Sequence, residues 1–228
     1  MIDSLQSQFR IKFPGFGDIV IRPFILDDDV PVIHDWFNRD YACFRKMQGK
    51  SLHHVREKYQ RLLAQSEYEV LAGILSSTGQ TIFFVECYKP EDDSIGKYYD
   101  AKASDRGFHI IMAPPERSIS GFTFFVMSAI AEYMFRDPSV RRIVAEPDIR
   151  NEKVLIRFAQ AGYRLAKVVQ LPSKTAQLVV LTRKRFSEID RLSPPQKKRL
   201  PFRRLRLQYH LFFGRALSKL GRFVFRSN

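Results

Sequence analysis

The amino-acid sequence predicts one α/β domain with a mixed central sheet flanked by helices, followed by a basic helical extension. Three observations lead to this prediction. The chain has 228 residues, 45% hydrophobic and 13% aromatic, which suits a single globular domain of ordinary size. Strand-like apolar runs alternate with amphipathic helical patterns as far as residue 182. Beyond that point the chain becomes strongly basic. We therefore expect a domain over 1–182 and an extension over 183–228.

The first half of the domain predicts two hairpins separated by two helices. Residues 11–24 carry two apolar runs around a Pro-Gly turn, and residues 69–88 carry two β-rich runs around a turn that contains Gly79. Between them, residues 27–37 and 52–65 repeat apolar side chains at helical spacing, and three aspartates begin the first of these helices.

The second half predicts strands that alternate with helices. Pro114-Pro115 and Asp137-Pro138 interrupt the apolar pattern, and Ala161-Gly162 is typical of a helix C-terminus. The expected elements are a strand over 106–112, a helix over 118–135, a strand over 142–146, a helix over 151–160, and strands over 163–170 and 175–182.

The net charge of +14 belongs almost entirely to the extension. Residues 183–228 hold 14 Lys or Arg against two Asp or Glu, which leaves residues 1–182 close to neutral at +2. A near-neutral body does not suit a nucleic-acid surface. The extension has three interpretations: docking of a partner enzyme, covering of the domain, or binding to an anionic membrane. Its interleaved aromatic residues also leave RNA binding open. We favour a packed or partner-binding helix.

Two cysteines and the absence of a leader pattern indicate a cytoplasmic protein. Cys43 and Cys87 are too few for a disulfide framework, and no Cys/His cluster has zinc spacing, so we expect no metal site. The N-terminus lacks the apolar segment of a signal peptide, and no apolar run reaches the roughly 18 residues of a membrane span.

Two segments carry the side chains best suited to chemistry, at residues 105–111 and 145–151. Each joins an apolar strand-like run to a group that handles protons, and one long helical pattern lies between them. A helix that crosses over and returns the chain to the same sheet makes the two strands neighbours. We therefore expect His109 and Asp148 to converge on one cleft, which would suit acyl transfer to an amine.

Five short stretches and the order of elements resemble a known fold family. The stretches are residues 33–38 (IHDWFN), 83–86 (FFVE), 105–109 (DRGFH), 147–151 (PDIRN) and 161–163 (AGY). Together they resemble the acyl-CoA-dependent N-acetyltransferase fold called GNAT, over roughly residues 20–182. More narrowly, they resemble the branch that acylates N-hydroxylated amines during hydroxamate siderophore assembly for iron acquisition: lysine N-acyltransferases and aerobactin-type N-hydroxylysine acetyltransferases.

The resemblance implies that His109 and Asp148 are the catalytic pair, and the chemistry of the side chains agrees. Acyl transfer needs a group near the attacking nitrogen that takes its proton, and histidine titrates near neutral pH. A neighbouring carboxylate can orient the imidazole and hold the amine or its hydroxyl. We predict His109 as the base and Asp148 as its orienting partner. A half-buried structural histidine and a helix N-cap are the alternatives.

The resemblance also implies an acyl-CoA cosubstrate, either acetyl-CoA or succinyl-CoA. Its pyrophosphate would bind backbone N–H groups where a strand meets a helix. Residues 116–123 occupy this place, although Gly121 alone matches the expected glycines, so an ordinary serine-capped helix is the alternative. Asn151 begins the next helix, at the usual pantetheine-facing position. The predicted cosubstrate contacts are Arg117, Ser118, Ser120, Gly121, Phe122 and Asn151.

Four further residues are predicted to bind the acceptor or the acyl group: His34, Trp36, Arg45 and Arg150. Core packing for Trp36 and a surface cap for His34 are the alternatives. Arg45 or Lys46 would pair with a carboxylate on the donor or acceptor, such as a succinyl group, unless they form a solvated basic turn. The family often places an acidic tyrosine where this chain has Phe158, so the thiolate would leave unassisted or take its proton from water.

Three functions from different classes remain open on the sequence. The first is N-acylation of a small hydroxylamine, such as N-hydroxylysine, N-hydroxyornithine or a hydroxylated diamine. The second is acetylation of a plain amine, such as a polyamine or a protein N-terminus. The third is a non-catalytic basic adaptor on the same fold. His109 and Asp148 together favour an enzyme.

Overall fold

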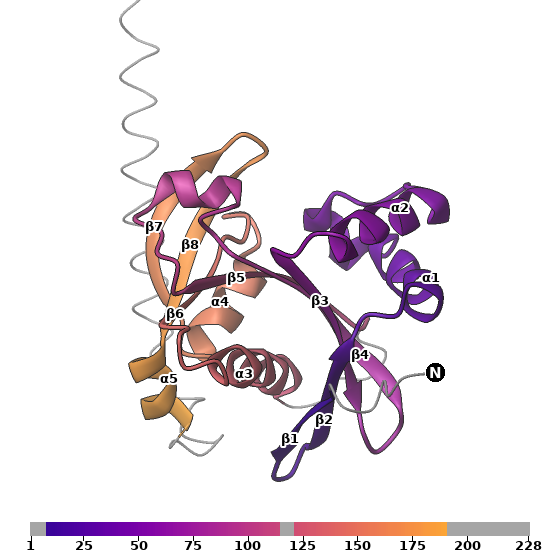
Figure 1. Cartoon of the computed structure of the whole chain (residues 1–228), viewed down its shortest axis with the longest axis horizontal. Helices are drawn as coiled ribbons and strands as arrows, with labels where there is room; N and C mark the ends of the chain where they lie inside the picture. Colours follow the sequence, from indigo (N-terminus) through magenta and orange to yellow (C-terminus); the bar gives the residue numbers. More distant parts are fainter. Residues whose placement is uncertain (1–7, 115–120, 191–228) are drawn as a thin grey trace, which may run out of the picture. The chain divides into compact units, whose positions relative to one another are not determined.

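The computed structural model describes residues 8–114 and 121–190 of the chain. These residues form a twisted eight-stranded sheet in the order β1-β2-β3-β4-β5-β6-β8-β7 (Figure 1). The predicted order of elements is confirmed. The strands are β1 (Phe9–Phe13), β2 (Gly17–Pro23), β3 (Tyr68–Leu75), β4 (Gln80–Tyr88), β5 (Asp105–Met112), β6 (Arg142–Ala145), β7 (Arg164–Leu171) and β8 (Lys174–Thr182).

β5 and β6 pair in parallel, whereas the other described strand pairs of the sheet are antiparallel. The pairing is short: it runs from Asp105 opposite Arg142 to Gly107 opposite Val144. Beyond that point β5 continues to Met112 against β4, while β6, which is paired with β8 along its whole length, ends at Ala145. The two strands therefore diverge after three pairs. Their parallel pairing is expected of a strand that returns to the sheet through a crossover helix.

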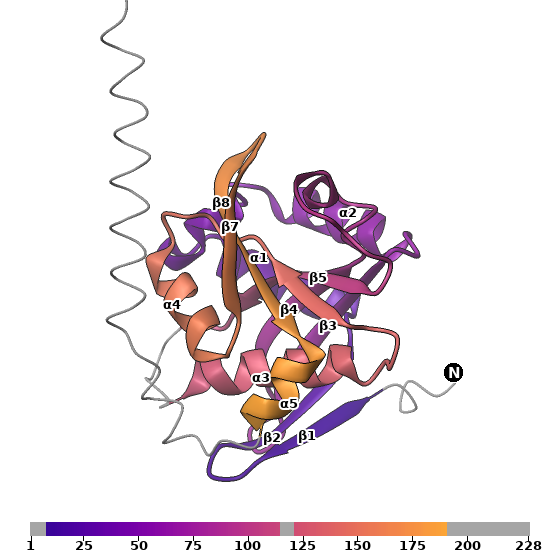
Figure 2. The same cartoon turned by 90° about the vertical axis from the view of Figure 1, so that its left-hand side faces the viewer.

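Helices cover both faces of the sheet (Figures 1 and 2). One face carries α1 and α2, and the other carries α3 and α4, so the sheet is buried between two layers. Two short 3₁₀ segments, η1 and η2, lie in the connections. The helical elements are α1 (Leu26–Phe37), η1 (Asp40–Arg45), α2 (Leu52–Leu63), η2 (Ser94–Tyr98), α3 (Phe122–Phe135), α4 (Glu152–Gln160) and α5 (Arg183–Asp190). Within the described residues, none of these helices is long and apolar enough to cross a membrane.

The three aspartates at the start of the first helix lie inside its first turn and not at its N-cap. The helix begins at Leu26, its N-cap residue Ile25 has no side-chain cap, and the aspartates fill the first turn. Asp29 is buried there because its carboxylate accepts the backbone N–H of Ile25 at 2.7 Å and pairs with Arg22 at 2.7 Å. An acidic first turn also suits the positive end of the helix dipole.

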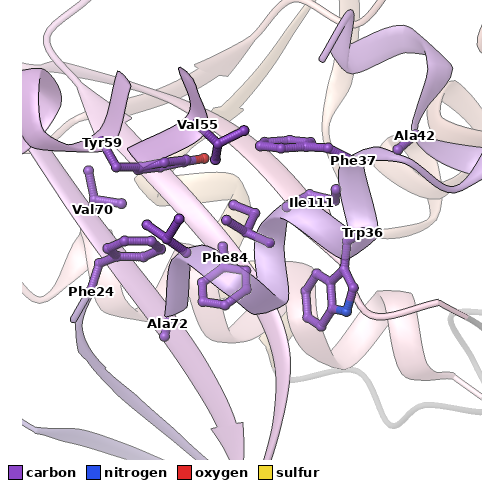
Figure 3. Close-up of a cluster of buried hydrophobic side chains, with 12 residues drawn as sticks. Phe24, Trp36, Phe37, Ala42, Val55, Tyr59, Val70, Ala72, Phe84 and Ile111 are labelled. Carbon is purple, nitrogen blue, oxygen red and sulfur yellow. The ribbon is translucent and has the colours of Figure 1, made fainter. Parts of the chain in front are cut away.

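A core of twelve buried side chains joins α1 and α2 to the sheet (Figure 3). Trp36 and Phe37 of α1 and Tyr59 of α2 pack on residues of β3, β4 and β5. Phe84 lies at its centre, with its ring 5.0 Å from that of Trp36 and 5.4 Å from that of Phe24. This core fixes the position of α2 and η1 above β4 and β5, where the candidate site lies.

The helix α5 packs on the domain, although the sequence assigned residues 183–190 to the extension. The ring of Phe186 lies 5.3 Å from that of Phe135, at the end of α3 (Figure 2). The guanidinium of Arg183 donates to backbone carbonyls of Phe135 and Val140 at 2.8 and 2.9 Å. Residues 183–190 therefore belong to the same compact unit as the sheet. The rest of the predicted extension, 191–228, lies outside the described residues.

Candidate active site

The candidate site lies where β5 and β6 diverge. His109 is two residues beyond the last β5 residue paired with β6, and Glu146 is two residues beyond its partner Val144. Their side chains contact each other where the two strands diverge, with His109 Nε2 2.8 Å from Glu146 Oε1. The two segments predicted to converge thus come together through His109 and Glu146, whereas the predicted pair was His109 and Asp148. The imidazole is 31% exposed and the Glu146 side chain 5%, so solvent reaches the site from the histidine side.

A second carboxylate faces the other nitrogen of the same imidazole. Glu86 of β4 is directly opposite His109 in the antiparallel ladder, and side chains of such a pair lie on the same face of the sheet. His109 Nδ1 is 3.4 Å from Glu86 Oε2. The imidazole is therefore held between two nearly buried carboxylates, one on each ring nitrogen.

Glu86 is surrounded by three donors from the α1–α2 layer. Its Oε1 accepts hydrogen bonds from the Tyr59 hydroxyl at 2.7 Å and from Arg45 Nη2 at 3.0 Å, and it also pairs with the Lys58 ammonium. Burial raises the pKa of this carboxyl, but the charges of Arg45, Lys58 and His109 outweigh burial and hold it well below its usual value. Glu86 is therefore a fixed negative charge at neutral pH.

Glu146 is likewise kept ionised. Its Oε2 accepts the Tyr88 hydroxyl at 2.8 Å, and its Oε1 lies 3.4 Å from Lys174 Nζ on β8. Burial alone would raise its pKa, but His109, Lys174 and the Tyr88 hydroxyl together lower the pKa to about 2. Both partners of the imidazole thus carry full negative charge at neutral pH.

The charge of His109 follows from these two neighbours. Burial disfavours the imidazolium, but the charge of Glu146 and the hydrogen bonds to Glu146 and Glu86 outweigh it and raise the pKa of His109 to about 9. The histidine is therefore protonated at neutral pH in the free protein. The predicted base must lose a proton before it can accept one.

Gly107 of the DRGFH stretch makes room for the Tyr88 ring. A Cβ at Gly107 would stand 2.3 Å from ring carbons of Tyr88, its cross-strand partner. The open space lets the Tyr88 ring lie 5.0 Å from the His109 ring and brings its hydroxyl to Glu146. The glycine therefore supports the site without touching the imidazole.

We expect Gly107→Ala to lower the free energy of unfolding by about 1–3 kcal/mol, because the added methyl displaces a buried aromatic ring. The midpoint of urea unfolding measures this. In a Tyr88→Ala background the same substitution should cost much less, because the atoms that it meets are gone. Equal costs in the two backgrounds would show that the Tyr88 ring is not what requires glycine here.

Asp148 lies on the same face of the sheet as His109 but holds a different partner. It pairs with Ala176 of β8 in an isolated bridge, and its carboxylate accepts Arg150 Nε and Nη2 at 2.9 and 2.8 Å. These hydrogen bonds lower the pKa of Asp148. The prediction that Asp148 orients His109 is therefore wrong in this structure, where Glu146 takes that place. The predicted contact of Asp148 with the acceptor remains a prediction.

Arg45 and Lys46 both bind other groups of this chain, a carboxylate and a backbone carbonyl. The Arg45 guanidinium pairs with Glu86 and is 20% exposed, while the Lys46 ammonium donates to the backbone carbonyl of Ser173 in the β7–β8 turn. Their positions do not support these two residues as receptors for an acyl carboxylate, and Arg45 is too buried for a solvated turn, whereas Lys46 is exposed. Arg45 instead holds Glu86 in place.

We accordingly expect Arg45→Ala to reduce turnover with acetyl-CoA and succinyl-CoA by the same factor, because it weakens the Glu86–His109 contact for either donor. The ratio of the two steady-state rates measures this, with Arg39→Ala as the control, since Arg39 is 56% exposed and pairs with Asp35. A selective loss with succinyl-CoA would restore the original role of Arg45.

His34 and Trp36, both predicted at the acceptor pocket, have structural positions. Trp36 is 6% exposed in the core against Phe84 (Figure 3), so its predicted acceptor contact is replaced by packing. His34 Nε2 lies 3.0 Å from the backbone carbonyl of Lys50, at the base of the α1–α2 connection. Arg150 differs: its side chain is 71% exposed, and its guanidinium lies 5.9 Å from the Phe44 ring centroid.

The predicted cosubstrate residues fall at two helix starts. Gly121 has φ +78° and precedes Phe122, the first residue of α3, so a left-handed turn leads into the helix. Asn151 is the N-cap of α4 and accepts the backbone N–H of Val154 at 3.3 Å. Arg117, Ser118 and Ser120 lie outside the described residues.

Phe158, which stands where the family often has an acidic tyrosine, is buried between Phe108 and Tyr163. The Tyr163 hydroxyl is buried without a hydrogen-bond partner in the described part of the chain.

Sequence reasoning missed most of the residues around the imidazole: Lys58, Tyr59, Glu86, Tyr88, Glu146 and Lys174. A signal was present for two of them. Glu86 interrupts the apolar run of β4, and Glu146 directly follows the apolar strand β6. A carboxylate in a run of buried apolar residues is rarely placed there without a partner.

Within the described residues, no group of three or more His, Cys, Asp or Glu side chains could hold a metal ion.

Comparison with known proteins identifies the family. A family model described as an acetyltransferase (GNAT) domain matches residues 26–171. This chain belongs to the GNAT acetyltransferase family. The fold expected from the sequence is thereby confirmed, and so is an acyltransferase at the level of the family. The matched range begins at α1 and ends with β7, so it contains His109, Glu86 and Glu146.

Several curated proteins similar to this GNAT chain act on hydroxylated amines by name. An N-hydroxyputrescine acetyltransferase of Acinetobacter baumannii is 23% identical over 166 residues, covering 73% of this chain and 78% of the relative. A hydroxyornithine transacylase of Ajellomyces capsulatus is 28% identical over 165 residues, covering 69% of this chain but 36% of the relative. The chain thus spans about a third of the second relative's length.

A solved structure of an uncharacterized protein from Bacillus halodurans has the same fold. It is 26% identical, with a TM-score of 0.73, and the match covers 82% of this chain and 95% of that one. The aminoglycoside acetyltransferase AAC(6')-Ib, solved in complex with coenzyme A, is 22% identical with a TM-score of 0.67. The match covers 75% of this chain and 99% of that one. At this identity the second likeness supports the fold alone.

Proposed function

We propose that this chain catalyses acyl-CoA-dependent N-acylation of an N-hydroxylated amine, forming a hydroxamate in siderophore biosynthesis for iron acquisition. One observation carries the proposal: a partly exposed histidine is held between two ionised carboxylates where β5 and β6 diverge. The names of the similar proteins that act on hydroxyornithine and N-hydroxyputrescine support the acceptor class.

The proposed reaction is a direct transfer. The nitrogen lone pair of the hydroxylamine attacks the thioester carbonyl carbon and forms the C–N bond. The C–S bond then breaks with its electron pair on sulfur. The proton of the acylated nitrogen passes to His109, which acts as the base once it has lost its resting proton. Because a hydroxylamine is less basic than an alkylamine, it arrives largely uncharged, and its lone pair is available without a strong base.

The described residues fit an acyl-CoA cosubstrate at two points. Pairing between β5 and β6 ends at Gly107 and Val144, which leaves backbone edges beyond them to receive an extended chain. The start of α3 after Gly121 offers backbone N–H groups that suit a phosphate. We therefore retain Gly121, Phe122 and Asn151 as proposed contacts with acetyl-CoA or succinyl-CoA, and Arg150 and Asp148 as proposed contacts with the acceptor.

The proposal is tested by release of free CoA with matched acceptors. Each N-hydroxylated amine (N-hydroxylysine, N-hydroxyornithine and N-hydroxyputrescine) is compared with its unhydroxylated parent at equal concentration. We expect kcat/KM to be higher for the hydroxylated member of at least one pair. Faster turnover of plain amines would favour an amine acetyltransferase instead. CoA release with none of them would favour the non-catalytic alternative.

A further inference from the structure

We propose that His109 enters the reaction as an imidazolium, gives a ring proton to the departing thiolate, and only then takes the proton of the acylated nitrogen. This inference rests on the proposed function and extends it, because it assigns His109 the role of acid as well as base. The two transfers occur in one turnover at one residue.

The argument begins with the two carboxylates around the ring. A neutral imidazole has one N–H donor and one bare nitrogen, whereas the imidazolium has two donors. Here Nε2 lies 2.8 Å from Glu146 and Nδ1 lies 3.4 Å from Glu86. A bare nitrogen would face a carboxylate lone pair on one side, so the contacts of both nitrogens are satisfied by the protonated ring.

The surrounding charges decide how firmly the proton is held. The charged groups that face the ring from the neighbouring elements are Glu86 of β4, Glu146 after β6, Arg45 of η1, Lys58 of α2 and Lys174 of β8. The hydroxyls of Tyr59 and Tyr88 donate to Glu86 and Glu146. The cations pair with the carboxylates, and each ring nitrogen faces a carboxylate. Burial opposes its charge, but Glu146 and Glu86 prevail and raise the pKa of His109 to about 9.

An acid of this strength suits the leaving group. A free cysteine thiol has a pKa near 8.5, so a thiolate of similar basicity accepts a proton from such an imidazolium at little cost in free energy. Tyr59 and Tyr88 are the nearby hydroxyl donors among the described residues, and both already donate to carboxylates. His109 is in addition 31% exposed, so its ring can reach a substrate.

The proposed step balances in atoms and charge. As the C–S bond breaks, its electron pair moves to sulfur, and the sulfur takes a proton from the imidazolium to give the free thiol and neutral imidazole. The imidazole then accepts the proton of the acylated nitrogen, which leaves a neutral hydroxamate and restores the imidazolium. No proton, oxidant or further reactant is needed from outside.

The pH dependence of kcat/KM separates this cycle from a base alone. A resting imidazolium that must give its proton predicts a kcat/KM that is level from about pH 7 and falls above about pH 9. A histidine acting as base alone predicts a kcat/KM that rises up to that pH. We expect Glu146→Gln to move the falling limb to lower pH by about one unit or more, because the nearest negative charge is lost. The control Glu57→Gln, on the exposed face of α2, should leave the profile unchanged.

Site-resolved NMR titration of the His109 ring in the free protein gives a second test that needs no turnover. A midpoint near pH 9 supports the resting imidazolium, and a midpoint near 6.5 overturns the proposal even if the enzyme is active. If hydroxylamines are not acylated, the proposed function fails, and the NMR midpoint alone decides the charge of the resting ring, because the pKa of about 10.4 of a plain amine would itself make kcat/KM rise with pH. With a hydroxylamine acceptor, a kcat/KM that rises with pH through the His109 midpoint overturns the acid role. A Glu146→Gln protein that does not fold leaves the wild-type profile and titration to decide.

Discussion

Replacing His109 by glutamine should lower kcat by a factor on the order of 10²–10⁴, the usual contribution of a positioned acid or base. Glutamine can still donate one hydrogen bond toward Glu146, but it cannot carry a proton to or from the substrate. The KM for acyl-CoA should change little, because the proposed cosubstrate contacts at α3 and α4 are unaffected. Steady-state rates of CoA release at saturating acceptor measure the effect.

The matched control for His109 is His53→Gln on α2. The His53 side chain is 80% exposed and pairs only with Glu57, at 3.3 Å on the same helix, among the described contacts. Its replacement should leave kcat unchanged. A kcat for His109→Gln within about threefold of the wild type would remove His109 from the proton transfer and with it the mechanism proposed for this site.

The second large effect concerns stability: Glu86→Gln should reduce the free energy of unfolding by about 3–5 kcal/mol. The substitution keeps the shape of the side chain but removes the charge that faces Arg45, Lys58 and His109. Those cations then lie in a partly buried place without their shared partner. Urea unfolding at pH 7 measures the loss as a lower midpoint at an unchanged m-value.

The same substitution should change the response of the protein to acid. The pKa of Glu86 is depressed in the folded state, so its stabilisation is complete above its unfolded value of 4.5 and is lost as the pH falls through the folded value. Glu86→Gln should therefore flatten the decline of stability below about pH 4.5. The control Glu57→Gln breaks an exposed pair and should cost less than about 0.5 kcal/mol. Equal losses for the two variants would contradict the central place of Glu86.

The order of strands and helices along the chain follows from the sequence, because the periodicity of apolar residues is local. The parallel pairing of β5 with β6 also follows, since a crossover helix between two strands brings them together as neighbours. His109 could be found from the DRGFH stretch. Its partner Glu86 could not, because the register between β4 and β5 decides which residue lies opposite, and no short motif encodes that register.

The mistaken partner of His109 has a similar cause. Glu146 and Asp148 are two residues apart and share a face of the sheet, so alternation alone does not distinguish them. The structure distinguishes them. Glu146 and His109 each lie two residues beyond the last β5–β6 pair, Gly107 and Val144, whereas Asp148 pairs with Ala176 of β8. The sequence also predicts a pocket position for Trp36, because an aromatic side chain on an amphipathic helix suits a ligand site as readily as a core.

Identification of the reaction product tests the proposed function most directly. The protein is incubated with acetyl-CoA and an N-hydroxylated amine, and the product is examined by mass spectrometry and by the colour of its ferric complex. We predict one added acetyl group and the ferric colour of a hydroxamate, both dependent on His109. An acetylated product without ferric colour would place the acyl group on oxygen or on another nitrogen, and would contradict the proposed hydroxamate synthesis.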